Sequence, residues 1–576
     1  MKNELVARIL FEIADLLVLD GVSFKPQAYR RAAETVASLH EPIEDLVADS
    51  RHAALPGVGG AIAKKIVEIV ETGHLAYHDE LKRKLPIDLY ALTRVDGVGP
   101  KTARLLYETL GVRSLADLER AARNGEIRAV KGLGEKTETK ILRGLDEARH
   151  VDGRILLGGA CSLAQTLIDR LEATGVFERI AVAGSLRRGR ETIGDLDLLA
   201  IAADPTTASD AFVGLPDVAE ILAHGTKKSS VRLSDGVQVD LRIVPPASFG
   251  AAMQYFTGSK DHNVALRKRA VARGWKLNEY GLYDGDGRAL AGGEEAGVYE
   301  ALGLPFVLPE LREDQGEIEA AGRGGLPDLV EIGDLRGDLH VHTDASDGRA
   351  SLAEMVGAAQ AGGLKYVAIT DHALFSEVIR GLTADDLRRQ IDEIDALNER
   401  LDGFRVLRGI EANIQPDGSL DVPEKLLDAL DVVVASVHSH FRQSHETMTA
   451  RLVRACESEF VDILGHPTGR KMGERPPVDA DWDAVFEAAA AHGTAMEINA
   501  NPIRLDLHAD LVRRAIAAGA RLAINTDAHV PEHFDFIHLG VVTARRGWAT
   551  KDDVLNAGPV EVIAASPDGR QRGGGR

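Results

Sequence analysis

Hydrophobic and polar positions change their period along this chain, and the change divides it into stretches of different structure. Through residues 1–150, apolar positions recur at helical spacing between short Gly-rich turns, which predicts an all-helical region. Residues 151–318 mix two periods: 155–174 is helical, whereas 195–202 and 237–244 alternate as strands. The stretch 309–337 is acidic and Gly-rich with little periodicity, which indicates a linker.

Residues 338–550 repeat a strand pattern followed, in most cases, by a helical pattern. Strands that alternate with helices indicate parallel βα units, and seven of them predict a TIM-like (βα)7 barrel. We expect the tail 561–576 to be disordered. The seven strand segments are DLHVH (338–342), YVAITDH (366–372), RVLRGIEAN (405–413), DVVVASVHS (431–439), VDILGHP (461–467), AMEINAN (495–501) and RLAINTDAH (521–529).

A short motif recurs three times in the helical region, as LPGVGGAIAKKI (55–66), VDGVGPKTARLL (95–106) and VKGLGEKTETKI (130–141). Each copy places a Gly-x-Gly turn directly before an amphipathic helix. Glycine lets the backbone turn tightly, and the helix behind it directs unpaired N–H groups and its positive dipole end to the same place. Such a seat binds phosphate without reading bases. This helix-hairpin-helix pattern predicts DNA-backbone contacts at Gly57, Gly59, Gly97, Gly99, Gly132 and Gly134.

The charge balance is compatible with nucleic-acid binding, although the formal net charge is −21. Residues 1–150 carry 23 basic and 23 acidic side chains, residues 151–320 carry 18 and 25, and residues 321–576 carry 27 and 41. The excess acid therefore lies in the last part, where bound cations could offset it. The segment with the three hairpins is neutral, and it can bind DNA through cations gathered on one face.

Composition argues against several other classes of protein. No apolar run reaches the roughly 18–20 residues that a membrane span needs, and the amphipathic start MKNELVARILFEIADLL lacks a signal-peptide layout. Cys161 and Cys456 are the only cysteines, which excludes a disulfide framework. We expect a cytoplasmic protein that acts as a monomer.

Three aspartates form the first candidate site. Asp195 and Asp197 stand two apart on a strand, so both side chains point to one face, and Asp240 lies on another strand that could pair beside it. Carboxylates gathered in this way repel one another unless divalent cations neutralise them. Two Mg²⁺ or Mn²⁺ ions could activate a hydroxyl there and bridge triphosphate oxygens.

The sequence GSLRRG (184–189) precedes these aspartates. We expect Gly184 and Ser185 to form a turn that lets a triphosphate approach the backbone, and Arg188 to donate to phosphate oxygens. The competing interpretation is a solvated acidic strand edge with a chance Asp-x-Asp. The upstream turn and the third aspartate disfavour it.

With these motifs and YFTGSKDHNVALR (255–267), residues 1–318 resemble a family X DNA polymerase of the nucleotidyltransferase superfamily. The resemblance implies gapped or nicked DNA and dNTPs as partners. It also implies a lyase-like hairpin domain for DNA ends over 1–85 and a fingers-type hairpin domain over 86–150. These would be followed by a nucleotidyltransferase palm over 151–245, a nucleotide-selecting thumb-like domain over 246–318 and a linker over 319–337.

The resemblance implies further roles around the nucleotide, in motifs that include Gly194 and Gly258. Tyr255 and Phe256 would form a flat wall beneath the sugar that discourages ribose, and Asn263 would face the base in the minor groove. The alternative, a helix N-terminus capped by nearby hydroxyls, is compatible with these roles.

Two positions bear on how closely the chain follows that family. Relatives often carry an arginine two residues before the third aspartate, where this chain has Gln238. For a lyase that attacks a sugar aldehyde, Lys65 matches the nucleophile and Lys25 a phosphate-binding position, but Ala61 replaces a lysine found in some active relatives. Simple phosphate binding by Lys65 stays open.

The last stretch holds nine residues of metal-ligand type, at or just after strand ends, the face where barrels assemble active sites. Nine nitrogen and oxygen ligands without cysteine suit two or three ions of zinc or manganese type, which could hold an activated water. They are His340, His342, Asp347, His372, Glu411, His438, His466, Asp527 and His529.

These nine residues resemble the complete metal motif of the polymerase and histidinol phosphatase (PHP) domain, here expected over 338–560. In bacterial family X polymerases this domain is associated with 3′–5′ exonuclease activity and with cleavage at abasic sites. The resemblance therefore implies a bifunctional enzyme for gap filling in base-excision repair.

Three other interpretations remain open. In one, the barrel only braces a polymerase, and in another the whole chain is a non-catalytic scaffold for DNA ends. The complete ligand sets disfavour both. A small-molecule phosphatase fused to a nucleotidyltransferase is the third, and the three phosphate-binding hairpins disfavour it.

Overall fold

The computed structural model describes residues 2–561 except 20–24, 38–42, 49–50, 52–57, 73, 83–86, 88, 90–91, 93–94, 96–97, 148–149, 152–153, 235, 374–380 and 474. The predicted contacts at Gly57 and Gly97 and nearly all of the tail expected to be disordered lie outside the described residues. The chain forms two compact units, Met1–His150 and Val151–Arg576.

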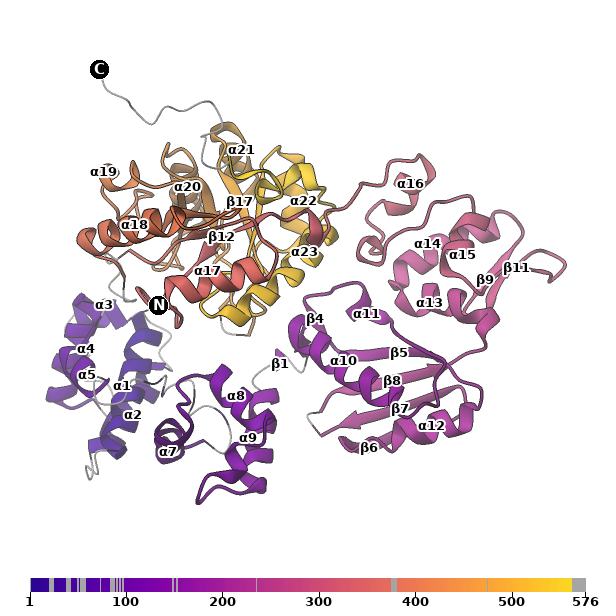
Figure 1. Cartoon of the computed structure of the whole chain (residues 1–576), viewed down its shortest axis with the longest axis horizontal. Coiled ribbons are helices and arrows are strands. Elements are labelled where there is room, and N and C mark those ends of the chain that lie inside the picture. Colours follow the sequence, from indigo (N-terminus) through magenta and orange to yellow (C-terminus); the bar gives the residue numbers. More distant parts are fainter. Residues whose placement is uncertain are drawn as a thin grey trace. The chain divides into compact units, whose positions relative to one another are not determined.

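Apart from His150, the first residue of β1, the elements described in the first unit are all helices, as predicted (Figure 1). One apolar core draws on its helices, and the first helix supplies Val6, Leu10, Ile13 and Leu17 at a spacing of three to four residues. The elements are α1 (Lys2–Leu19), α2 (Lys25–Ala37), α3 (Ile43–Ala48), α4 (Gly60–Thr72), α5 (Ala76–Lys82), α7 (Pro100–Leu110), α8 (Leu115–Arg123), η2 (Ile127–Ala129) and α9 (Glu135–Glu147).

The second unit begins with a five-stranded sheet of order β3-β5-β8-β7-β6, accompanied by a small sheet β1-β2-β4 (Figure 1). The elements are β1 (His150–Val151), β2 (Arg154–Leu156), α10 (Leu157–Glu172), β3 (Arg179–Val182), α11 (Gly184–Arg187), β4 (Thr192–Ile193), β5 (Asp195–Ile201), α12 (Pro205–Val213), β6 (Val218–Ala223), β7 (Lys228–Leu233) and β8 (Gln238–Ile243).

Alternation along β5 and β8 assigns the two faces of this sheet. Leu196 and Leu198 of β5 and Leu241 of β8 join one core with α10 and α12. On the other face, Leu199 packs against Phe249 of α13 (Phe249–Thr257). The aspartates predicted for the first site fall on the face away from α10 and α12.

A smaller helical region with three short strands follows the sheet. Its core gathers α14 (Lys260–Val271) and α15 (Glu295–Ala301). The remaining elements are η3 (Pro246–Ser248), β9 (Lys276–Asn278), β10 (Gly281–Tyr283), β11 (Ala289–Ala291), η4 (Pro309–Leu311) and α16 (Glu317–Gly322).

The segment predicted as a linker is partly built into this region. Ile318, Ala321 and Leu329 are buried in the same core as α14 and α15. The core therefore extends beyond residue 318, because isolated apolar side chains within an acidic, Gly-rich sequence still find a hydrophobic surface to cover.

The last region is a nearly closed barrel of seven parallel strands in sequence order, as predicted. Its ends meet where the amide of His342 donates to the carbonyl of Ala528, at 2.8 Å. The strands are β12 (Gly337–Val341), β13 (Tyr366–Ile369), β14 (Arg405–Asn413), β15 (Val432–Ser436), β16 (Ile463–Gly465), β17 (Ala495–Asn499) and β18 (Leu522–Asn525).

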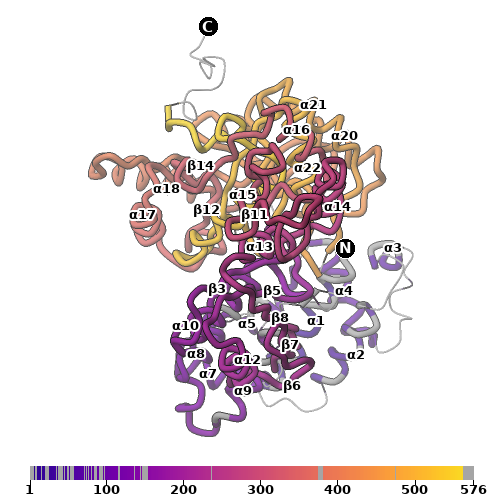
Figure 2. Tube along the Cα trace, turned by 90° about the vertical axis from the view of Figure 1, so that its right-hand side faces the viewer, coloured from indigo at the N-terminus to yellow at the C-terminus, as the bar shows by residue number. Residues whose placement is uncertain are grey.

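Helices cover the outside of the barrel, and Figure 2 shows α17 and α18 beside the strands β12 and β14. The helical elements are η5 (Ile332–Asp334), α17 (Leu352–Ala361), α18 (Ala384–Asn398), α19 (Glu424–Leu427), α20 (His445–Cys456), α21 (Trp482–His492), α22 (Ala509–Ala517), η6 (Pro531–Phe536), α23 (Ile537–Arg546), η7 (Lys551–Asp553) and η8 (Leu555–Ala557). None of the helices in the described part of the chain combines the length and apolarity that a membrane span requires.

Candidate functional sites

The three aspartates lie together on one face of the sheet. The strands β5 and β8 run parallel as neighbours, with Asp197 directly opposite Asp240. Burial and the nearby charges of Asp195 and Asp240 raise the pKa of Asp197 to about 6, although Arg242 and Lys228 oppose the shift. The cluster thus concentrates negative charge that bound divalent cations would neutralise, which fits the expected metal pair.

Asp240 has its own support from neighbouring strands. The ammonium of Lys228 on β7 lies 2.6 Å from its Oδ2, and Gln238 donates to its Oδ1 at 3.1 Å. Although burial raises it, these contacts and one with Ser230 hold the pKa of Asp240 below its usual value. Lys228 therefore supplies a cation beside Asp240, where the neutral Gln238 supplies none. The sequence analysis missed Lys228, because only strand pairing brings it beside Asp240.

The Gly-Ser turn touches the same cluster. Gly184 has a φ of +64°, and a Cβ there would lie 2.2 Å from Oδ2 of Asp197. A larger residue would therefore displace the carboxylate. Ser185 follows on α11, and Gly194 is crowded in the same way, since a Cβ would lie 2.7 Å from Nη1 of Arg154.

The two arginines after the turn bind the thumb-like region. Arg187 forms a bidentate pair with Glu295, at 2.8 and 2.7 Å. Arg188 donates through Nε to Glu313 at 3.1 Å and through Nη1 to the carbonyl of Thr257. The expected triphosphate contact of Arg188 is untested, and its guanidinium is already anchored beside the turn.

The nucleotide-wall motif lies on α13 and at the start of α14. The prediction of one flat aromatic wall is wrong, because the rings of Tyr255 and Phe256 meet edge to face at 79°. Consecutive helical residues point about 100° apart, so the two rings leave the helix in different directions. Arg242 instead stacks on Phe256, 4.1 Å from the ring centroid.

Asn263 and Gly258 have partners within the protein. The amide of Asn263 donates to the carbonyl of Tyr255 at 2.7 Å and accepts from Gln254 at 2.7 Å. A Cβ on Gly258, whose φ is +71°, would lie 3.2 Å from Nη1 of Arg188. These two bonds orient the amide of Asn263 and leave its second N–H and a second lone pair of its oxygen for a base edge.

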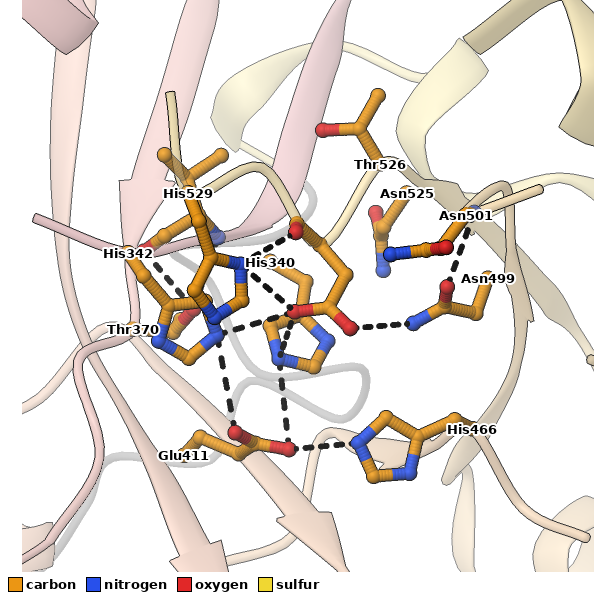
Figure 3. Close-up of polar contacts among 12 residues, drawn as sticks. His340, His342, Thr370, Glu411, His466, Asn499, Asn501, Asn525, Thr526 and His529 are labelled. Carbon is orange, nitrogen blue, oxygen red and sulfur yellow. Dashed lines mark hydrogen bonds and ion pairs between the residues drawn. The ribbon is translucent and has the colours of Figure 1, made fainter. Parts of the chain in front are cut away.

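The predicted barrel ligands lie at one end of the strands, and eight of the nine fall into three overlapping groups. Figure 3 shows five of the nine with labels, namely His340, His342, Glu411, His466 and His529. The first contains His342, Asp347, His372 and His529, the second His340, His342 and Asp527, and the third His372, Glu411 and His438. His466 joins them through its Nε2, which lies 3.0 Å from Oε1 of Glu411. Parallel strands end at the same edge, which is why residues so far apart in sequence meet here.

Hydrogen bonds orient several of the imidazoles. Nδ1 of His340 lies 2.8 Å from Glu497, Nδ1 of His438 lies 2.5 Å from Asn413, and Nδ1 of His529 lies 2.8 Å from the carbonyl of Asp527. Each contact leaves Nε2 directed at the cluster. Such partners fix the tautomer and the ring orientation of metal-ligating histidines.

The free donor atoms fit bound cations. Within the described residues, Nε2 of His340, both ring nitrogens of His342 and Oε1 of Glu411 are buried and form no hydrogen bond of suitable geometry, although other side chains of the cluster lie close, such as Nε2 of His466 at 3.0 Å from Oε1 of Glu411. Buried polar atoms are rarely left unsatisfied, so these atoms indicate ligands of another kind. Nitrogen and carboxylate donors without sulfur suit zinc or manganese.

The charges of the cluster support the same interpretation. Burial alone would lower the pKa of His340, but Glu497, Glu411 and Asp527 raise it well above its usual value. Burial alone would raise the pKa of Glu411, but His372, His438 and His340 hold it well below its usual value. The carboxylates are therefore anionic, and bound cations can replace the protons that balance them.

Glu497 is a buried acid that the sequence analysis did not select. Besides His340, it accepts from the amide of His466 at 2.6 Å and from the side chain of Asn525 at 2.9 Å. The signal was present in the strand AMEINAN, where an acid stands among apolar residues that are buried. A buried carboxylate in such a strand requires positively charged or donor partners.

The described hairpin turns of the first unit are open to solvent. Gly59, Gly99 and Gly134 are exposed, and each precedes the first residue of a helix, α4, α7 or α9. A Cβ at any of them, or at Gly132, would meet nothing within 4 Å. A phosphate can therefore approach these helix N-termini.

The lysines predicted for the first unit differ in environment. Lys25 is exposed, whereas Lys65 is half-buried. The ammonium of Lys65 lies 4.2 Å from the ring centroid of Tyr77, which is a cation–π contact.

Four protein-family models match the chain. They are a helix-hairpin-helix domain over residues 1–75, a tandem of such hairpins over 89–147, the DNA polymerase beta thumb over 252–313 and the PHP domain over 338–501. Each match falls on the region where the fold has the corresponding architecture.

Three known proteins are similar in sequence to this chain, each over a different share of its length. Rat DNA polymerase lambda is 26% identical over 324 residues, 51% of this chain and 53% of its own. A probable phosphatase of Caldanaerobacter subterraneus is 31% identical over 204 residues, 34% of this chain and 76% of its own. The DNA polymerase/3′-5′ exonuclease PolX of Bacillus subtilis is 37% identical over 569 residues, 98% of this chain and 99% of its own. Because this relative is 37% identical over nearly the whole chain, and the thumb and PHP models match as well, the chain belongs to the bacterial family X DNA polymerases that carry a PHP domain.

Proposed function

We propose that this polymerase fills gaps during DNA repair, extending a primer at the palm and trimming its 3′ end at the barrel. The observation that carries the proposal is the pair of separate charged sites in one chain. Asp195, Asp197 and Asp240 gather beside a tight Gly-Ser turn, and the nine barrel residues gather elsewhere. The relative from Bacillus subtilis is named for both activities.

At the palm, Asp195, Asp197 and Asp240 hold two Mg²⁺ or Mn²⁺ ions, which neutralise charge during phosphoryl transfer when they are bound. Gly184, Ser185 and Arg188 receive the triphosphate. The neighbouring contacts to the nucleotide come from Gly194, Tyr255, Phe256, Gly258 and Asn263.

Of the three aspartates, Asp240 has the clearest contacts with neighbouring side chains, namely Lys228 and Gln238. Lys228 keeps it ionised, and an ionised carboxylate is the form that would hold a metal ion.

At the barrel, the nine residues hold two or three Zn²⁺ or Mn²⁺ ions, which supply an activated water and a positive seat for a phosphodiester when bound. The hydrogen bonds of Glu497 and Asn413 keep Nε2 of His340 and His438 directed inward. Cleavage at abasic sites is a further reaction of the same class, because it also breaks a phosphodiester.

The first unit holds the DNA through its backbone. Exposed glycine turns at helix N-termini bind phosphate and read no base. We therefore expect the logarithm of affinity for gapped DNA to fall linearly with the logarithm of salt concentration. A strong preference for one DNA sequence would contradict this mode of binding.

A lyase step at Lys65 stays a prediction. The half-buried amine beside Tyr77 is a possible nucleophile, with Lys25 as a phosphate contact. Borohydride should trap an adduct between the protein and incised abasic DNA, and Lys65→Ala should lose it. Trapping that persists in the variant would place the nucleophile elsewhere.

One experiment tests the two main activities together. A gapped DNA with a 5′-labelled primer is incubated with the full chain, with and without dNTPs, first in Mg²⁺ and then in Mn²⁺. We expect extension when dNTPs are present and shortening from the 3′ end when they are absent. Extension without any shortening in Mn²⁺ would favour a barrel that only braces the polymerase.

A further inference from the structure

A helix of the barrel packs directly on the palm beside its Gly-Ser turn. Gly189, which follows α11, has a φ of +66°, and a Cβ there would lie 2.1 Å from Cγ1 of Val542 on α23. Leu539 of α23 is buried in the same core as α10. At Gly158 on α10, a Cβ would lie 3.2 Å from Cδ1 of Leu539. The close approach of α23 thus depends on glycines of the palm.

Arg546, at the end of α23, binds the backbone of Arg188, the first residue after α11. Its Nη1 donates to the carbonyl of Arg188 at 2.6 Å and to Oε1 of Glu313 at 3.1 Å. The same Oε1 accepts from Nε of Arg188 at 3.1 Å. The side chain of Arg546 is only 8% exposed, so water cannot readily replace these bonds. Arg546 therefore fixes both the backbone of Arg188 and the carboxylate that orients its guanidinium.

A second arginine of the barrel holds the other end of this segment. Arg470 forms a bidentate pair with Glu191, at 3.2 and 2.7 Å. It also donates to the carbonyl of Arg504 at 2.7 Å and to that of Leu505. Arg470 is itself immobilised by the barrel, so it presents a rigid partner to Glu191.

Residues 188–191, which these two arginines hold, join the Gly-Ser turn of the polymerase site to the strand that carries two of its aspartates. Residues 188–191 connect α11, which carries Gly184 and Ser185, with β4 and then β5, which carries Asp195 and Asp197. A shift of the segment would move the turn and Arg188 relative to the aspartates. Catalysis by positioning is sensitive to displacements of about 1 Å.

We propose that Arg546 and Arg470 are positioning residues of the polymerase, through which the barrel holds the triphosphate-binding turn in place. The proposal rests on the nucleotide site proposed above. Neither arginine touches the nucleotide. Both act through residues 188–191, and their effect is independent of the metal ions of the barrel.

The test measures single-nucleotide gap filling by the full chain in Mg²⁺. For Arg546→Met we expect the KM for dNTP to rise about tenfold or more, as for the loss of a charge-assisted hydrogen bond, with the affinity for gapped DNA unchanged. Arg546→Lys should recover part of the loss, because it keeps the charge but not the fork-shaped donor.

The control is Arg514→Met on the neighbouring helix α22. Arg514 pairs with Asp483 at 2.7 Å within the barrel and is 46% exposed, so its loss should leave the KM for dNTP unchanged. Glu191→Gln provides a second variant at a half-exposed position of the palm. It weakens the contact with Arg470 and should raise the KM for dNTP even if Arg546→Met does not fold.

The outcomes separate this inference from the proposed function. Folded Arg546→Met and Glu191→Gln proteins with an unchanged KM for dNTP would overturn the inference, even if their melting temperatures fall. A wild-type protein that fills no gap would instead overturn the proposed function. A rise in KM with partial recovery in Arg546→Lys supports the inference, because a general loss of stability would not follow dNTP concentration.

Discussion

The palm and the barrel hold their charged groups in different ways. In the palm, three carboxylates lie side by side on neighbouring strands, Asp195 is exposed, and an added cation, Lys228, sits against Asp240. In the barrel, nine nitrogen and oxygen ligands lie close together at one end of the strands, and most of them are buried. Hydrogen bonds with Glu497 and Asn413 orient the barrel imidazoles in advance.

This difference indicates how each site would obtain its cations. The palm provides only part of a coordination shell, which suits Mg²⁺ that arrives with substrate phosphates and keeps its waters. The barrel provides complete sets of donors, so its ions should stay bound without substrate. We therefore regard the palm as a site completed by the nucleotide and the barrel as a preformed metal centre.

The largest effect should follow from Asp197→Ala. Extension should fall by on the order of 10²–10³-fold or more, because phosphoryl transfer depends on preorganised charge. Shortening of the primer in Mn²⁺ should survive, since the barrel ligands are untouched. Primer-extension gels and thermal melts of the same preparation check this. Loss of both activities in a folded protein that still binds DNA would mean that the two sites are not separate.

The next effect concerns the orientation of the barrel ligands. Glu497→Gln keeps the size of the side chain but removes the charge that faces His340, and we expect a loss of about 10–100-fold in metal affinity or in nuclease activity. Metal titration followed by elemental analysis measures it. Glu487→Gln, at an exposed position of α21, is the matched control. Unchanged metal binding would show that the imidazoles do not depend on this partner.

A smaller effect is expected at the palm from Lys228→Met. The lysine side chain is 40% exposed, so solvent screens part of its interaction with Asp240, and the loss in extension rate should be about three- to tenfold. Lys227→Met, on the exposed neighbour, should have no effect. Equal rates for both variants would show that Gln238 and Ser230 support Asp240 without the lysine.

The smallest effect is expected in the choice of sugar. Tyr255→Ala should raise the use of rNTP relative to dNTP by a few-fold to about tenfold, because it removes bulk without removing a hydrogen bond to the nucleotide. Paired steady-state kinetics with both nucleotides measure the ratio. Tyr280→Ala, at a tyrosine that is 45% exposed, is the control. If the ratio of rNTP to dNTP use does not change, Phe256 or the backbone would be what discriminates against ribose.

The parts of both sites that follow from local rules could be predicted from sequence. Alternation along a strand puts Asp195 and Asp197 on one face, and parallel strands put their following residues at one end of a barrel. These two rules predicted the shared face of Asp195 and Asp197 and the gathering of the nine barrel residues at one end of the strands, whereas Asp240 joins the aspartates through the pairing of β5 with β8. They also predicted the seven-stranded barrel and the helical first unit.

The parts that depend on pairing over long distances could not be predicted in this way. Lys228 reaches Asp240 only because β7 pairs with β8, and Glu313 meets Arg188 across 125 residues of sequence. The flat wall of Tyr255 and Phe256 failed for a local reason, since the helix turns between the two residues. The predicted linker included Ile318, Ala321 and Leu329, which are buried in a core, because composition does not show which few apolar residues will be buried.

The most direct test of two separate chemistries is the effect of His342→Ala on both activities in one preparation. His342 belongs to two of the three groups of barrel ligands, so the variant should bind fewer metal ions by elemental analysis. We expect it to extend a gapped primer in Mg²⁺ at the wild-type rate and to shorten the primer little in Mn²⁺. Shortening at the wild-type rate despite the loss of metal ions would contradict the assignment of the nuclease to the barrel.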